Sequence, residues 1–287
     1  MPYDHRKILA LASSLAACVA LAGCGGESQP PKTPDAKATG ASTPTAPTGP
    51  TSAPEPTQAR SRTGPLAGRT IVIDPGHNPG NFRHSREINQ KVDIGTSHKE
   101  CDTTGTSTNA GYTEAAFTLD VSHRLRDLLK AQGAKVVLTH DAERPYGPCI
   151  DERARTGNEA RADAVVSVHA DGSATGNRGF HVILPARVGS GAADTSKIVG
   201  LSRTLGEAIA RHFARATGTA PANYLGSGTG LDVRDDLGGL NLSTVPKVFV
   251  ECGNMRDPKD AALLTDAAWR QKAARGIADG IGTYLKG

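Results

Sequence analysis

Residues 70–77 read Thr-Ile-Val-Ile-Asp-Pro-Gly-His, and this stretch decides the fold class. A β-branched apolar run that meets Asp-Pro-Gly predicts a short buried strand closed by a turn. The first residue beyond the turn is His77, whose side chain can bind a metal or move a proton. We therefore expect an internal strand that ends in a chemically useful group.

Outward from this stretch, apolar strands and amphipathic helices alternate along the chain. Further strands are predicted at Lys135–Thr139, Ala164–His169, Gly179–Leu184 and Lys247–Glu251. Helices are predicted from Thr113 to Gln132, at 151–162, from about 195 to 216, and as a pair after Pro258. The alternation of apolar strands with helices predicts an α/β fold, a single domain with a mainly parallel twisted sheet and helices on both faces.

The first residues have the pattern of an export signal. Arg6 and Lys7 precede an apolar or small run, Ile8–Ala22, which is too short for a comfortable transmembrane helix. The run ends in Leu-Ala-Gly before Cys24, which resembles the lipobox of bacterial lipoproteins, where this cysteine receives the lipid. An ordinary secretory signal cut nearby is the alternative. We interpret 1–24 as a signal peptide with a lipobox, and we expect an exported, extracytoplasmic protein that is lipid-anchored to the cell membrane at Cys24.

A tether follows the signal. Residues 25–65 are rich in Pro, Ser, Thr and Ala and show no apolar periodicity, so this segment cannot bury enough surface to offset its ordering entropy. We expect this segment to be disordered and to let a membrane-anchored domain reach into the layer outside the membrane. The folded catalytic domain is then predicted at 66–287.

The charge of the chain excludes one class of partner. The net charge is +4 and aromatic residues make up 4% of the chain. The sequence has no cluster of basic residues interspersed with aromatic residues. This composition argues against a surface for nucleic acid. The sequence contains nothing that requires a dimer, so we expect a monomer.

The cysteines of the folded part predict one disulfide. An exported protein lives where disulfides persist. Cys101 and Cys149 both lie in polar, turn-rich segments, whereas Cys252 follows an apolar strand. We therefore pair Cys101 with Cys149 and expect Cys252 to be a buried free thiol.

Polar side chains of one chemical kind follow separate strands. His77, His169 and Glu251 each come at the end of an apolar strand, and Glu114 lies in the first turn of the helix that begins near Thr113. Ligands of open α/β sheets bind beyond the carboxyl ends of the strands, so these side chains can converge on one crevice.

The residue types in this group fit a hydrolytic zinc site. Two histidines and one carboxylate are a usual set of protein ligands for catalytic zinc, with the fourth position left to water. A second carboxylate is then needed to take a proton from that water, and Glu114 and Glu251 could divide the two tasks. Two alternatives stay open at this point: the histidines could be structural, or the site could hold non-haem iron.

The motifs around these residues resemble those of the zinc-dependent N-acetylmuramoyl-L-alanine amidases of the third type, and within them the single-domain mycobacterial-type members. The likeness runs from about Ala67 to Tyr284 and rests on Ile73–His77, Gly111–Glu114, Ser167–Asp171, Val248–Asn254, Asp257-Pro258 and Ala261–Leu264. The resemblance implies that His77, Glu114 and His169 are zinc ligands and that Glu251 is the catalytic general base. It also implies an α/β fold.

One feature departs from the family pattern. Many family members place the ligand glutamate much sooner after the Asp-Pro-Gly-His turn, whereas a long loop, 78–110, intervenes here. Glu87 and Glu100 are therefore alternative carboxylates. We prefer Glu114 because it opens a helix with an apolar face, as the family's residue does, and a Cys101–Cys149 bridge would pin the loop.

The resulting prediction is a peptidoglycan amidase. It would hydrolyse the amide bond between the lactyl group of N-acetylmuramic acid and L-alanine of the stem peptide, with polymeric peptidoglycan or muropeptide fragments as substrate. Because no wall-binding repeat is recognisable, fragments are the expected preference. The alternatives are an exported lipoprotein that binds such fragments without cleavage, and another zinc peptidase or deacetylase.

Other polar residues receive weaker hypotheses. Asp74 could orient a histidine ligand, although turn formation before a proline explains it equally well. Asp171 could turn toward the site or simply form a turn. Arg234, Asp235 and Asn241 could line a groove for the stem peptide or belong to a solvated loop.

Overall fold

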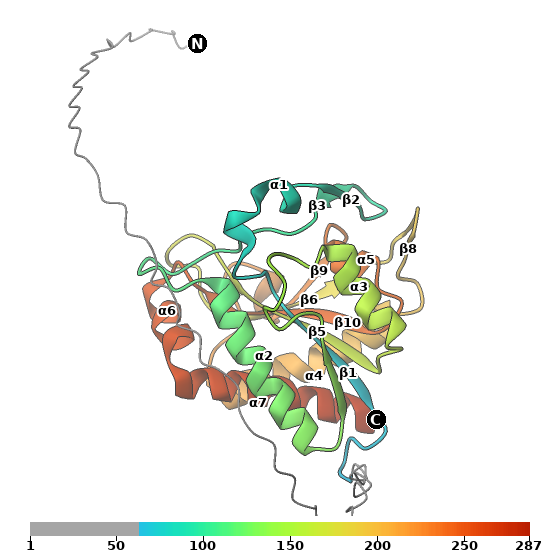
Figure 1. Ribbon diagram of the computed structural model, residues 1–287. Helices are drawn as coiled ribbons and strands as arrows, with labels where there is room; N and C mark the ends of the chain where they lie inside the picture. Colours follow the sequence, from blue (N-terminus) through green and yellow to red (C-terminus); the bar gives the residue numbers. More distant parts are fainter. Residues whose placement is uncertain (1–62) are drawn as a thin grey trace, which may run out of the picture. The chain divides into compact units, whose positions relative to one another are not determined.

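The computed structural model describes residues 63–287 (Figure 1). The predicted signal peptide, the proposed lipidation site Cys24 and the tether as far as residue 62 lie outside the described residues. Among the described helices, none combines the length and the apolar character needed to cross a membrane.

A six-stranded sheet forms the centre of the domain, in the order β4-β1-β5-β10-β6-β9. Its strands are β4 (Lys135–Leu138), β1 (Thr70–Pro75), β5 (Ala164–Asp171), β10 (Lys247–Asn254), β6 (His181–Pro185) and β9 (Leu231–Arg234). The first four of these are parallel to one another, whereas β6 runs antiparallel to β10 and parallel to β9. The prediction of an α/β domain with a mainly parallel sheet is confirmed.

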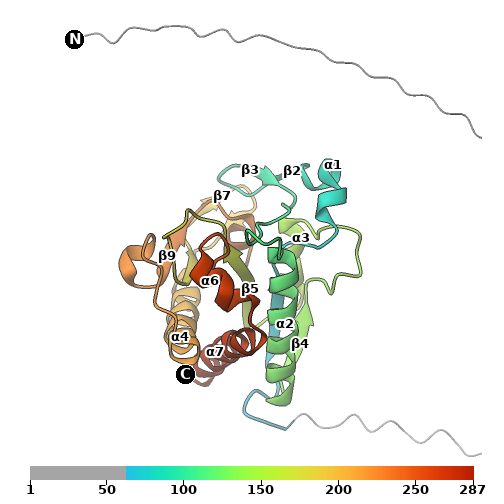
Figure 2. The same cartoon turned by 90° about the vertical axis from the view of Figure 1, so that its left-hand side faces the viewer.

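Helices cover both faces of this sheet. On one face lie α2 (Glu114–Ala131), α4 (Val199–Thr217) and α7 (Ala267–Lys286), with α7 in contact with both of the others (Figure 2). On the other face lie α3 (Ile150–Glu159) and the single turn α5 (Gly238–Asn241). The short helix α6 (Pro258–Thr265) connects the end of β10 to α7.

Side-chain caps fix where the main helices begin. The Thr113 hydroxyl accepts a hydrogen bond from the amide of Ala116 at the start of α2. Asp257 caps α6 and Asp266 caps α7 in the same way. Such caps satisfy amides that have no partner inside the helix, so these starts follow from the local sequence.

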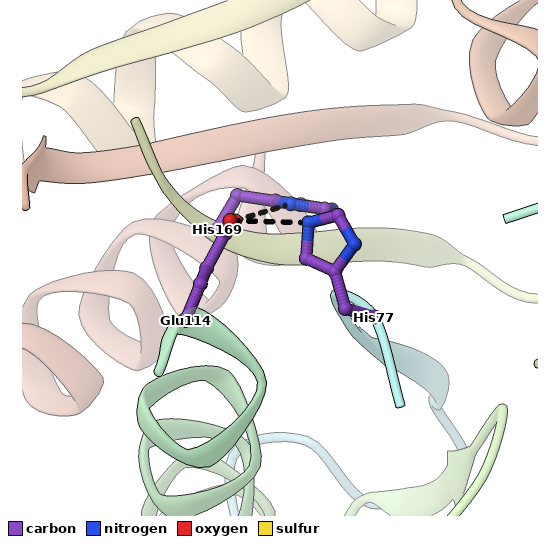
Figure 3. A group of neighbouring side chains, drawn as sticks. All are labelled: His77, Glu114 and His169. Carbon is purple, nitrogen blue, oxygen red and sulfur yellow. Dashed lines mark hydrogen bonds and ion pairs between the residues drawn. The ribbon is translucent and has the colours of Figure 1, made fainter. Parts of the chain in front are cut away.

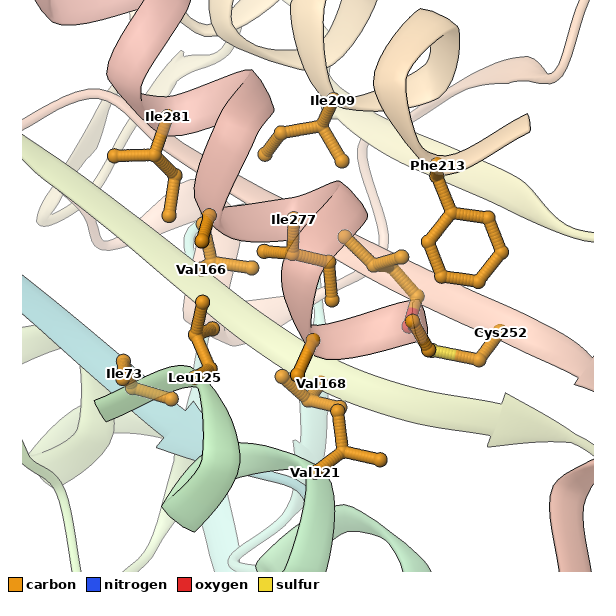
Figure 4. Close-up of a cluster of buried hydrophobic side chains, with 14 of the residues drawn as sticks. Ile73, Val121, Leu125, Val166, Val168, Ile209, Phe213, Cys252, Ile277 and Ile281 are labelled. Atoms are coloured by element: carbon orange, nitrogen blue, oxygen red, sulfur yellow. The ribbon is translucent and has the colours of Figure 1, made fainter. Parts of the chain in front are cut away.

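The two faces of the sheet bury different amounts of apolar surface. Against α2, α4 and α7, the strands and helices form one large cluster, part of which Figure 4 shows: Ile73, Val121, Leu125, Val166, Val168, Ile209, Phe213, Cys252, Ile277 and Ile281. On the α3 face, the buried cluster consists of Val72, Ala162 and Val165. The large cluster therefore supplies most of the hydrophobic stabilisation.

The segment 78–110, which we expected to be a loop, contains short elements. These are the 3-10 turn η1 (Asn81–Arg83), the one-turn helix α1 (Ser85–Ile88) and the hairpin of β2 (Lys91–Asp93) with β3 (His98–Glu100). They lie at the top of the domain in Figure 1 and Figure 2, at the end away from α7. Such elements are too short to produce a periodic apolar pattern.

Four further small elements were also absent from the prediction. They are the edge strand β9, the two-residue pair β7 (Gly189–Ser190) and β8 (Ala193–Asp194), and the 3-10 turn η2 (Gly226–Gly228). The four-residue strand β9 lies between glycine-rich turns, so its sequence resembles a loop.

Candidate metal centre

Three side chains from separate elements converge at the carboxyl end of the sheet (Figure 3). His77 follows β1, Glu114 is the first residue of α2, and His169 lies in β5. His77 Nε2 is 3.2 Å from Glu114 Oε2, and His169 Nδ1 is 3.0 Å from Glu114 Oε1. The potential ligand atoms of all three residues lie within 4.8 Å of one another. The structure thus brings together the three residues that the sequence nominated as metal ligands.

The two alternative carboxylates lie elsewhere. Glu87 is 3.8 Å from His84 within the α1 segment, and Glu100 pairs with Lys91 across the β2–β3 hairpin. Among the three candidates, Glu114 is the one that contacts both His77 and His169.

Two glycines make this close approach possible. A Cβ atom on Gly76 would lie 2.4 Å from the His169 ring, and a Cβ on Gly105 would lie 2.7 Å from the ring of His77. Gly105 also has a φ of +71°, which glycine adopts without strain. Larger residues at these positions would push the two imidazoles out of place.

Backbone amides hold the Glu114 carboxylate from both sides. Its Oε1 accepts a hydrogen bond from the amide of Ala170 at 3.2 Å, and its Oε2 accepts one from the amide of Thr106 at 2.9 Å. Burial by itself would raise the pKa of Glu114, but the charge of His77 and hydrogen bonds from both histidines hold the pKa well below its usual range. Glu114 is therefore a fixed anion.

The residues around His77 and His169 favour a positive charge between the two imidazole rings. Burial lowers the pKa of His77, but Glu114 and Asp102 outweigh this effect and raise the pKa to about 10. The His169 ring stacks on Phe249, with centroids 5.1 Å apart, which limits its rotation. A cluster that stabilises a proton this strongly has the charge balance to accept a cation.

Glu251 lines the same hollow as His77, Glu114 and His169. It is the register partner of His169 on the adjacent strand, and the ladder of β10 with β5 becomes irregular just beyond it. Both residues line a hollow of about 280 Å³ together with His77 and Glu114. The Oε2 atom of Glu251 is buried and has no hydrogen-bond partner in the described chain. Burial and the negative charges of Glu114 and Asp171 raise the pKa of Glu251 well above its usual value.

A second hollow continues from the first beneath the β2–β3 hairpin. It has a volume of about 290 Å³ and shares His77, His169, Arg234 and Phe249 with the first. Its mouth carries the charged side chains of Lys99 and Asp236, which lie 3.5 Å apart. The two hollows therefore adjoin each other beside the three candidate ligands.

The hypothesis that Asp74 orients a histidine ligand is wrong. The Asp74 carboxylate accepts hydrogen bonds from Arg153 Nη1 at 2.8 Å, Lys247 Nζ at 3.2 Å, Thr139 and Ser167, and none from a histidine. Strand alternation turns Asp74 away from α2, toward charged partners that are remote in the sequence.

Asp102 is the residue near His77 that the sequence analysis missed. One of its carboxylate oxygens lies 3.6 Å from His77 Nδ1. The sequence feature that could have indicated Asp102 is its position directly after Cys101, in the loop that the predicted disulfide pins.

Of the other polar residues that the sequence suggested for the site, some line the hollows and others do not. Arg234 lines both hollows. Asp171 lines the first hollow and accepts a hydrogen bond from the Tyr224 hydroxyl at 2.7 Å. Asn241 is buried and donates to the carbonyl of Asp235, so it supports the chain rather than a groove. Asp235 itself is exposed.

The cysteines have the predicted arrangement. A disulfide joins Cys101 to Cys149, the residue that precedes α3. Cys252 is buried and, within the described residues, free. The disulfide attaches the segment 78–110 to the α3 face of the sheet.

Comparison with known proteins gives a consistent result. A family model described as N-acetylmuramoyl-L-alanine amidase matches residues 71–283. The chain is 41% identical to the N-acetylmuramoyl-L-alanine amidase Rv3717 of Mycobacterium tuberculosis, over 77% of this chain and 88% of that protein. It is 25% identical to the probable cell wall amidase LytH of Staphylococcus epidermidis, over 77% of this chain and 60% of that protein.

A solved structure agrees with these sequence matches. The crystal structure of the N-acetylmuramyl-L-alanine amidase Ami1 from Mycobacterium smegmatis superimposes with a TM-score of 0.70 at 38% identity. The similarity covers 77% of this chain and 98% of that one.

Proposed function

Since the chain belongs to the N-acetylmuramoyl-L-alanine amidase family, we propose that it uses zinc and Glu251 to hydrolyse the bond between the lactyl group of N-acetylmuramic acid and L-alanine in peptidoglycan. The observation that carries the proposal is the convergence of His77, Glu114 and His169 in a hollow that also contains a second carboxylate. Metal-assisted amide hydrolysis needs both parts.

The donor set fits zinc. Two imidazole nitrogens and one carboxylate oxygen are a ligand set of catalytic zinc, and these atoms already lie within 4.8 Å of one another. The side chains of His77, Glu114 and His169 would hold the ion, while the hollow beside them leaves room for water and substrate. When bound, zinc supplies a Lewis acid for the scissile carbonyl and lowers the pKa of water toward about 7.

Glu251 is proposed to move the proton. Its unpartnered Oε2 is free to accept a proton from the attacking water, and burial makes the protonated form easier to reach. The same oxygen would then deliver the proton to the departing nitrogen of L-alanine. A carboxylate whose pKa is raised by burial holds the proton more firmly between the two steps.

The place of action is proposed to lie outside the cytoplasm. The export-like segment 1–24 and the similarity to a relative described as a probable cell wall amidase both support this proposal. Lipid attachment at Cys24 would hold a monomeric enzyme at the membrane, and 25–65 would let it reach its substrate.

Mass spectrometry of a defined muropeptide tests the proposed reaction. The full chain with zinc is expected to release a free stem peptide that begins with L-alanine. Chelated wild-type protein is expected to release none, and Glu251→Gln is expected to release the stem peptide about 10²-fold to 10⁴-fold more slowly. As a matched control, Asp120→Asn neutralises a carboxylate on α2 that pairs with Arg270 and should cut normally. Cleavage at another bond would favour a peptidase or deacetylase, and binding without cleavage would favour a binding protein.

A further inference from the structure

A second buried carboxylate stands behind His77, on the side away from Glu114. The Nδ1 atom of His77 is 3.1 Å from the carbonyl oxygen of Thr103 and 3.6 Å from Asp102 Oδ1. Its Nε2 atom faces Glu114. The segment Asp102-Thr103 therefore holds one ring nitrogen while the other points into the candidate metal site.

The backbone of this segment is itself fixed. Asp102 Oδ1 accepts a hydrogen bond from the amide of Thr103 at 2.8 Å. The Thr103 carbonyl also accepts a hydrogen bond from Asn81 Nδ2 at 2.7 Å. The acceptor that faces His77 thus cannot turn away without breaking other contacts.

Arg153 joins Asp102 to the sheet. Its Nη2 donates to Asp102 at 2.8 Å and its Nη1 donates to Asp74, also at 2.8 Å. Its Nε and Nη1 also donate to the carbonyls of Pro148 and Pro75. Arg153 is 5% exposed, and Asp102 and Asp74 are 6% and 1% exposed. A planar guanidinium between two carboxylates fixes their separation better than a single point charge would.

The disulfide brings the two halves of this clamp together. Cys101 directly precedes Asp102, and Cys149 precedes the first turn of α3, which carries Arg153. The amide of Ile150 donates to the carbonyl of Cys101 at 2.8 Å, next to the bridge. The bridge therefore sets the position of the long loop relative to α3 at the point where Asp102 meets Arg153.

We propose that Asp102 is a positioning residue for His77, that Arg153 clamps it, and that the Cys101–Cys149 bridge thereby sets how tightly the site holds zinc. The inference rests on the proposed function, since it assumes that His77 is a zinc ligand. Outer partners of a histidine ligand fix its tautomer and ring orientation, and losing one typically weakens metal binding about 10-fold to 100-fold. The long loop 78–110 would therefore contribute to the metal site.

Zinc affinity of the metal-stripped full chain tests this proposal without any assay of activity. Competition with a chromophoric chelator is expected to give a Kd about 10-fold to 100-fold higher for Asp102→Asn than for the wild type. The amide keeps the size of the carboxylate and can still accept from Arg153. Asp120→Asn is the matched control, because it also removes the charge of an aspartate paired with arginine but contacts neither histidine.

Two further measurements separate positioning from a general loss of structure. At saturating zinc, the Asp102→Asn enzyme should recover most of its kcat with an unchanged KM, which a collapsed site would not do. Reduction of the wild type with a phosphine should weaken zinc binding in the same direction. If Asp102→Asn does not fold, Arg153→Lys replaces it in the titration with the same expected weakening.

The outcomes distinguish the inference from its premise. Wild-type zinc affinity in Asp102→Asn, or in Arg153→Lys where that variant replaces it, would overturn the positioning role while the proposed function stands. An unchanged affinity after reduction would overturn the role of the bridge. A wild-type chain that binds no zinc would overturn the proposed function and, with it, this inference.

Discussion

The same strands present opposite chemistry on their two faces. Toward α2, α4 and α7 they carry Ile73, Val166, Val168 and Val250, all buried in one apolar cluster. Toward α3 and the long loop, the neighbouring positions carry Asp74, Ser167, His169, Lys247 and Glu251. The alternation of side chains along a strand produces this division. One face of the sheet therefore stabilises the fold, while the other holds charges at the positions that the proposed reaction needs.

The α3 face could hold buried charges only because they are paired. Lys247 is fully buried and donates to Asp74 at 3.2 Å, while Arg153 connects Asp74 to Asp102. Two cations and two carboxylates form one network, so that no charge of the set is left without a partner. Glu251 differs, since its Oε2 is buried without a hydrogen-bond partner among the described residues, which suits the proton transfer proposed for it.

The largest expected effect comes from the charged face and concerns activity. Glu251→Gln should lower kcat about 10²-fold to 10⁴-fold, because the general base is lost while the shape of the side chain stays. The melting temperature should be nearly unchanged. Muropeptide turnover and thermal unfolding of the same preparation check both expectations. A variant that keeps wild-type kcat would remove Glu251 from the mechanism.

The matching change on the apolar face should affect stability. Ile277 on α7 is fully buried in the large cluster, so Ile277→Ala should lower the free energy of unfolding by about 2–5 kcal/mol. At a temperature where the variant is folded, its kcat should stay close to that of the wild type. A large loss of kcat in fully folded Ile277→Ala would contradict the proposed division of roles between the faces.

The response to acid should sharpen the comparison. Burial by itself would raise the pKa of Asp74, but Lys247, Arg153 and two hydroxyl groups hold it well below the usual value. A carboxyl group whose pKa is lower in the folded state stabilises the protein above its unfolded pKa of about 3.9. This contribution is lost as the pH falls below that value toward the folded pKa.

The free energy of unfolding, measured from pH 6 downward by denaturant titration, checks this expectation. The wild type should lose stability steeply below about pH 4, and Asp74→Asn should show a shallower loss. Ile277→Ala serves as the control, since it should lower the whole curve and leave the slope unchanged. Equal slopes for wild type and Asp74→Asn would mean that Asp74 contributes little to the acid response.

The smallest effect is expected at a partly exposed ion pair between two helices. The Asp120 carboxylate on α2 pairs with Arg124 of the same helix and with Arg270 of α7, and it is one-third exposed, at 33%. Asp120→Asn should therefore change the free energy of unfolding by no more than about 1 kcal/mol and leave turnover unchanged. A loss of unfolding free energy comparable to that of Ile277→Ala would show that this ion pair stabilises the domain as much as a buried apolar side chain does.

The sequence predicted the sheet and the residues at its strand ends well. Apolar runs such as Ile71–Ile73 and Val165–Val168 carry a strong local signal, and parallel strands bring the residues that follow them to one edge. His77, His169 and Glu251 could therefore be nominated together, whereas Glu114 opens a helix and its place among the metal ligands came from the family resemblance. The antiparallel direction of β6 carried no such signal, because the direction of a strand does not change its apolar pattern.

The surroundings of the site could not be predicted in the same way. Asp102 lies in a long segment without periodicity, and its distance to His77 depends on the Cys101–Cys149 bridge and on Arg153 in a later helix. For Asp74 the sequence offered a contact with a histidine or a role in the turn, and neither interpretation indicated Arg153 and Lys247, because these contacts depend on which face of β1 Asp74 occupies. Such contacts follow from tertiary structure rather than from local pattern.

The central claim is that His77, Glu114 and His169 hold one zinc ion, and its most direct test is the zinc content of the full chain after exhaustive dialysis. Elemental analysis of the wild type should give one zinc ion per chain. The His169→Ala and Glu114→Gln variants should retain almost none, while Glu251→Gln should retain the wild-type amount. Full zinc occupancy in the two ligand variants, or none in the wild type, would contradict the account.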